Sequence, residues 1–124
     1  MISKALDNIS VGIALFNDSD FFAAHDFFED CWMDCEREER NFYQGLVQVS
    51  VGSYHLISGN YKGCGSQYKK AAKKLSKYLP VHQNIDLALL LNQIEPIIFD
   101  LGENPKNVDP KKFWNRIPKI EVTK

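Results

Sequence analysis

The chain has 124 residues, of which 44% are hydrophobic and 25% charged, and its formal net charge is -1. A chain of this length forms one globular domain that buries roughly two-thirds of its unfolded surface, so two domains are excluded. The near-neutral charge also excludes a strong overall field favouring nucleic acid or an anionic membrane.

The cysteine count, the N-terminal segment and the length of the apolar runs indicate the cellular compartment of the protein. Three cysteines in a chain of this size indicate reduced thiols and a cytoplasmic protein. The N-terminal segment has no basic leader with a cleavage site. The longest nearly apolar stretch, residues 46–57, is much shorter than the roughly 20 residues that cross a bilayer, so we expect no membrane association.

The first two predicted elements are amphipathic helices. Apolar residues recur every three or four positions from residue 2 to residue 16, which is typical of one helix face. The polar residues 17–20 favour a turn and an N-cap. A second helix is predicted to begin at Phe21, and its stripe consists of Phe21, Phe22, His25, Phe28, Glu29, Trp32 and Cys35.

Three further helices are predicted. Residues 42–56 are hydrophobic around most of the circumference and must be surrounded. A turn at 58–60 leads to a fourth helix with apolar residues on one side and lysines mostly on the other, closed by Pro80. The fifth begins at about Asn84, and we expect Pro96 to kink or interrupt it.

The C-terminal segment differs in composition from the rest. Prolines and lysines after Gly102 leave room for one helical turn near residues 111–115, and the segment contains Phe113, Trp114, Ile117 and Ile120, which should dock on the helices. No strand pattern is found. The predicted fold is all-α: an antiparallel bundle of four to five helices over residues 1–102, with an extended tail at 103–124 that packs on it.

Polar residues interrupt two stripes that should be apolar. His25 and Glu29 are neighbours on the second helix, and Gln44, Gln48 and His55 lie within about 40° of one another on the third. We expect these stripes to converge in a desolvated pocket. In that environment Glu29→Ala should destabilise by a few kcal/mol, because its partners would be left unpaired.

Three interpretations of this cluster remain open. The first is a buried hydrogen-bond network, because most buried polar groups in proteins are structural and hydrogen-bonded. The second is a divalent-metal or general acid/base site of His25, Glu29 and His55. The third is a ligand pocket. The ligand-binding candidates are Trp32, Tyr43, Gln44, Gln48 and Tyr54. The His-x-x-x-Glu spacing matches no strong metal motif, so no cofactor is expected in the first interpretation.

The remaining cysteines and charges are less specific. Cys31 and Cys35 are interpreted as small buried hydrophobes, Cys64 stands alone, and His82 is expected to be exposed in a loop. Residues 18–39 hold nine acids and one base, whereas residues 62–77 hold six lysines and no acid. Such a lysine face is more often solvated, or paired with an acidic helix of the same or a second subunit, than bound to nucleic acid.

Residues 16–80 resemble the small all-helical family known as domain of unknown function 309. The resemblance rests on the segments FFAAHDFFEDCW, FYQGLVQVSVGSYHLISGNYKGC and KLSKYLP. It implies a compact helical bundle and supports His25, Glu29, Gln48 and His55 as the residues of interest, but it implies no activity. Asp26, Val47 and Cys64 depart from the residues usual in that family, which are Glu, Ile and Ala.

The leading interpretation is a non-enzymatic binding or interaction module that self-associates. The first alternative is a metal-dependent, hydrolase-like enzyme using His25, Glu29 and His55. The second is a module that binds nucleic acid or an acidic partner through the lysine-rich helix at 62–77.

Overall fold

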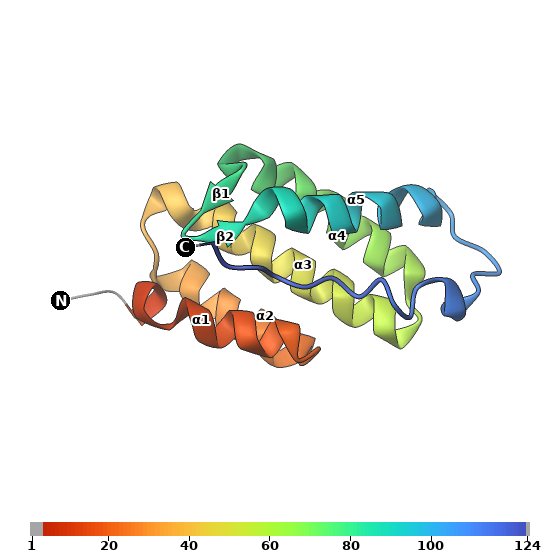
Figure 1. The fold of residues 1–124 in the computed structure, drawn as a ribbon, viewed down its shortest axis with the longest axis horizontal. Coiled ribbons are helices and arrows are strands. Elements are labelled where there is room, and N and C mark those ends of the chain that lie inside the picture. The colour runs from red at the N-terminus through yellow and green to blue at the C-terminus, as the bar shows by residue number, and fades with distance from the viewer. Residues whose placement is uncertain (1–3, 124) are drawn as a thin grey trace.

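Over the residues that the structure describes, the chain forms a bundle of five helices, within the predicted number of four to five. The computed structural model describes residues 4–123, with side chains from residue 9 onward. The helices are α1 (Lys4–Asn17), α2 (Phe21–Asp34), α3 (Arg40–Ser58), α4 (Tyr61–Leu75) and α5 (Leu87–Leu101). Figure 1 shows α3 in the middle, with α1 and α2 on one side and α4 and α5 on the other. None of the helices in residues 4–123 has the length and apolar character required to span a membrane.

Side-chain caps fix the starts of three of the described helices. Asp20, Asn60 and Asp86 each accept a hydrogen bond from the backbone N–H three residues ahead, at the starts of α2, α4 and α5. These short polar side chains satisfy donors that have no partner within the helix. Gly59 ends α3 at φ 82°, a left-handed conformation that glycine adopts without steric cost.

The core lies where α3 meets its neighbours, and α3 makes its most extensive contacts with α4 and α2. Gly45 and Gly52 allow α4 to approach closely: a Cβ on Gly52 would lie 2.5 Å from the ring of Tyr68. The fully buried Tyr68 hydroxyl and Ser53 Oγ are 2.7 Å apart, and Ser53 donates to the Val49 carbonyl. This polar pair is therefore satisfied inside the core.

A short hairpin precedes α5, where no strand was predicted. Strands β1 (Val81–His82) and β2 (Ile85–Asp86) pair antiparallel through a turn in which Gln83 and Asn84 have φ values of 48° and 64°. Strands of two residues are too short to show alternation. Consequently α5 begins at Leu87 rather than at about Asn84, and the expectation of no strand is corrected.

Pro96 does not interrupt α5, which continues from Leu87 to Leu101. A proline cannot donate to the carbonyl four residues earlier, which here belongs to Asn92. Asn92 and Pro96 are both exposed, so water can satisfy that carbonyl. The expected interruption is therefore wrong.

The C-terminal segment runs back along the bundle and ends near the β hairpin (Figure 1). It contains one short 3-10 turn at Pro110–Lys112, and Phe113 and Ile120 are buried. The Asn17 side chain pairs with the backbone of Ile120: its Nδ2 donates to the carbonyl at 2.9 Å, and its Oδ1 accepts from the N–H at 2.8 Å. Trp114 was expected to dock but is 68% exposed, because Phe113 takes the inward position of this turn.

Candidate functional site

A shallow pocket opens between α2 and α3. Its volume is about 230 Å³, and we call it the α2–α3 groove; its lining residues are Phe21, Phe22, His25, Val51, Tyr54 and His55. Phe22 is 64% exposed and Tyr54 44% exposed, and their rings meet edge to face with centroids 6.2 Å apart. Two large aromatic side chains thus remain accessible beside two imidazoles.

The ring of His25 is fixed by its own helix. Its Nδ1 lies 2.7 Å from the Phe22 carbonyl, which can only accept, so Nδ1 must carry the proton. In the neutral ring this leaves the Nε2 lone pair available. His25 is therefore an acceptor, or a metal ligand, through Nε2.

His55 has the opposite arrangement. The Asn60 Oδ1 accepts from the Gly63 N–H at 3.0 Å, which fixes the orientation of that amide. The Asn60 Nδ2 therefore donates to His55 Nδ1, at 3.3 Å. The neutral His55 ring then carries its proton on Nε2, so the α2–α3 groove is lined by one acceptor imidazole and one donor imidazole.

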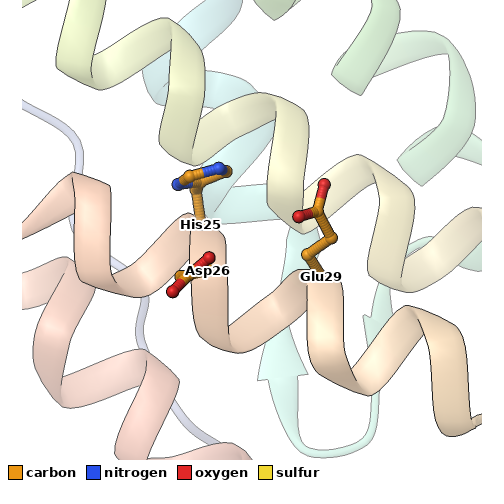
Figure 2. A group of neighbouring side chains, drawn as sticks. All are labelled: His25, Asp26 and Glu29. Atoms are coloured by element: carbon orange, nitrogen blue, oxygen red, sulfur yellow. The ribbon is translucent and has the colours of Figure 1, made fainter.

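His25 also belongs to a cluster on α2. One potential ligand atom from each of His25, Asp26 and Glu29 lies within 4.8 Å of the other two. Figure 2 shows the side chains of His25 and Glu29 extending from α2 on the side that faces α3. Asp26 and Glu29 are exposed and His25 is half-buried.

The predicted single desolvated pocket is therefore corrected. Glu29 is exposed, and of the predicted site residues only His25, His55 and Tyr54 line the α2–α3 groove. Gln44 and Gln48 are half-buried, and the buried Oε1 of Gln48 has no hydrogen-bond partner. Trp32 lies farther along α2, half-buried, with the Arg40 guanidinium 4.5 Å from its ring centroid. The stripe of α2 faces α3 as predicted, but Glu29 lies at the edge of that stripe and is exposed to solvent.

This position changes the expected effect of Glu29→Ala. The free energy of unfolding should change by no more than about 0.5 kcal/mol, because an exposed side chain leaves no buried partner unpaired. Urea denaturation of the variant and the wild type measures the difference. A loss of a few kcal/mol would contradict the exposed placement.

A second polar cluster, which sequence reasoning missed, fastens the β hairpin. His82 was expected to be exposed, but its Nε2 donates to Glu39 Oε1 at 2.7 Å, with both side chains about one-quarter exposed. Gln83 Nε2 donates to the same oxygen at 2.6 Å and to the Tyr43 hydroxyl at 3.0 Å. The His82 ring packs against Phe42 and Tyr78. The partners are about 40 residues apart, so no local spacing indicates them.

Burial raises the pKa of Tyr43 from 10.0 to about 12 and that of Cys64 from 9.0 to about 12. Well below pH 9 both groups are protonated in the folded and in the unfolded chain, so the free energy of unfolding does not depend on their titration there. Between pH 9 and 12 the unfolded chain loses these protons first, and the free energy of unfolding should fall. Urea denaturation across this pH range measures the fall in the free energy of unfolding. In the Tyr43→Phe variant that fall should be smaller above pH 10. An unchanged slope in that variant would contradict the assignment.

The buried and exposed faces of α4 separate as predicted. Lys62, Lys69, Lys70, Lys73 and Lys77 are exposed, and Lys69 Nζ lies 3.5 Å from a Glu103 carboxylate oxygen. Both side chains of this pair are largely solvated, so it adds little stability.

Cys31 and Cys64 are buried, whereas Cys35 is half-buried with its pKa raised by burial.

Comparison with known proteins gives a family but no activity. A family model described as a domain of unknown function, DUF309, matches residues 9–66, which include α2, α3 and all the residues that line the α2–α3 groove. No curated protein matches the chain significantly.

Proposed function

Because the chain belongs to the DUF309 family over residues 9–66, and that family has no described activity, we propose a function from the site itself. The domain is a binding module whose α2–α3 groove takes up an apolar anchor side chain from a basic segment of a partner protein. The observation that carries this proposal is the exposed Phe22–Tyr54 pair at the mouth of a pocket of about 230 Å³.

The shape of the groove supports a protein side chain as the occupant. Exposed aromatic side chains beside a concavity are typical of anchoring sites, where one buried aromatic or aliphatic group supplies much of the binding energy. The walls formed by Phe21, Phe22 and Val51 are apolar. His25 Nε2 and His55 Nε2–H add one acceptor and one donor that would orient the anchor.

The charge around the groove supports a basic partner. Helix α2 carries four acidic residues, three of which are Asp26, Glu29 and Asp30, and it carries no Lys or Arg. A basic amphipathic helix placed along this face would meet attractive charge around its apolar anchor, the mode in which helices occupy grooves. A second copy that met this face through its own α2 would meet like charge instead.

Titration of the ¹⁵N-labelled protein with a helical peptide of Lys, Ala and one Trp tests the proposal. The amides of Phe21, Phe22, Val51 and Tyr54 should shift saturably, and added salt should weaken binding. Phe22→Ala should reduce the affinity about tenfold, whereas Phe99→Ala, which removes another exposed phenylalanine on α5, should leave it unchanged.

A charge-reversed peptide, with Glu in place of Lys, is the matched probe and should not bind. No saturable shift with the Lys peptide, or an equal effect of Phe22→Ala and Phe99→Ala, would overturn the proposal. Shifts of the groove amides that depend on protein concentration alone would instead assign the groove to self-association. In that case the lysines of α4 are the complementary surface.

The second candidate is a metal-dependent, hydrolase-like enzyme, which the proximity of His25 and Glu29 favours. His55 was its expected third ligand, but the Nδ1 of His55 already accepts from Asn60. Absence of turnover of activated phosphate and carboxylate esters by Zn²⁺- and Mn²⁺-supplemented protein would remove this candidate. A nucleic-acid function of α4 predicts RNA or DNA binding that falls steeply with salt, and an unshifted labelled oligonucleotide at about 50 mM salt would remove it.

A further inference from the structure

We propose that His25, Asp26 and Glu29 form a binding site for a divalent transition-metal ion at the edge of the α2–α3 groove. The three residues lie on two successive turns of α2, and one potential ligand atom from each lies within 4.8 Å of the others (Figure 2). Their positions i, i+1 and i+4 span about 100° around the helix, so one ion can reach all three.

The hydrogen bond of His25 prepares it as a ligand. A metal-binding imidazole usually donates its other ring N–H to a carbonyl or carboxylate, which fixes the tautomer and the ring orientation. His25 does this through Nδ1, at 2.7 Å from the Phe22 carbonyl oxygen. The lone pair of Nε2 is then ready to bind a metal without loss of a proton or of that contact.

The surroundings of the cluster are rich in acceptors and contain no cationic side chain from α2. The exposed carboxylates of Asp26 and Glu29 therefore make this edge of the α2–α3 groove attractive to a cation.

The donor set selects the class of ion. One imidazole and two carboxylates suit Zn²⁺ and its first-row neighbours, whereas Ca²⁺ and Mg²⁺ prefer oxygen ligands alone. Ligand atoms around Zn²⁺ stand roughly 3.3 Å apart at bonds of about 2.0–2.2 Å. Rotation of the exposed Asp26 and Glu29 side chains closes the remaining distance, and the free coordination positions would face solvent or a bound partner.

Calorimetric titration of the untagged full chain with Zn²⁺ tests the site. We expect one ion per chain, and we expect His25→Ala and Glu29→Gln each to weaken binding at least about tenfold. Asp30→Asn is the matched control, since it also removes one exposed carboxylate from α2 but lies outside the cluster. In the histidine ¹⁵N spectrum Zn²⁺ should shift Nε2 of His25 while Nδ1 keeps its proton.

Thiols are the competing zinc ligands, and Cys35→Ser distinguishes them because that half-buried thiol is the most accessible of the three cysteines. Binding that survives Cys35→Ser and fails in Glu29→Gln supports the site. Binding lost in Cys35→Ser, binding equally weakened by Asp30→Asn and Glu29→Gln, or no saturable binding would overturn it. The test is independent of the partner peptide, because the titration contains Zn²⁺ and no peptide.

Discussion

Replacing Phe42 by alanine is expected to lower the free energy of unfolding by about 3–5 kcal/mol. Phe42 is fully buried near the start of α3, and its ring contacts those of Tyr43, Tyr78 and His82 at centroid distances of 5.1, 5.5 and 4.6 Å. Its removal leaves a cavity under the β hairpin as well as losing apolar contacts. Urea denaturation of the variant and wild type provides the measurement.

The matched control is Phe99→Ala, since Phe99 is 86% exposed and its loss should change stability by less than about 0.5 kcal/mol. A double-mutant cycle with His82→Ala should show coupling, because both side chains support the same hairpin. Similar stabilities for Phe42→Ala and Phe99→Ala would contradict the assigned packing.

Gly52→Ala should destabilise the protein by about 1–3 kcal/mol, the usual effect of overpacking. The added Cβ would lie 2.5 and 2.7 Å from two carbons of the Tyr68 ring. That ring cannot rotate away freely, because it is fully buried and its hydroxyl contacts Ser53. Either α3 and α4 must separate or the hydrogen bond must be lost.

Gly65→Ala provides the control, since a Cβ at this helical position meets no atom within 4 Å. Alanine is the better helix former, so this variant should gain up to about 1 kcal/mol. Thermal and urea denaturation of both variants test the pair. A stabilised Gly52→Ala would show that α3 and α4 are not in close contact there.

The helices were predictable because local sequence signals mark them. Asp20 and Asn60 cap α2 and α4 through local hydrogen bonds, and the 3.6-residue period marks the buried faces. The hairpin of residues 81–86 was not predictable, because its strands are two residues long and its partners, Glu39 and Tyr43, are about 40 residues away. Pro96 does not interrupt α5 for a related reason: its exposure, which local sequence does not determine, lets water satisfy the carbonyl that it leaves without a donor.

The candidate site was predicted in part. Periodicity correctly placed His25 and His55 on the facing sides of two adjacent helices. It could not place Glu29, because the stripe of α2 is wider than the surface that α3 covers, and a residue at its edge is solvated. Nor could it assign the imidazole tautomers, which depend on the Phe22 carbonyl and the Asn60 amide.

These tautomers are the most direct test of the α2–α3 groove as a functional site. Long-range ¹H–¹⁵N spectra of the histidine rings, recorded where both are neutral, distinguish a proton on Nδ1 from one on Nε2. We expect Nδ1–H for His25 and Nε2–H for His55, with His55 alone reverting to a mixture of tautomers in Asn60→Ala. The same tautomer at both residues, or a reversed assignment, would contradict it.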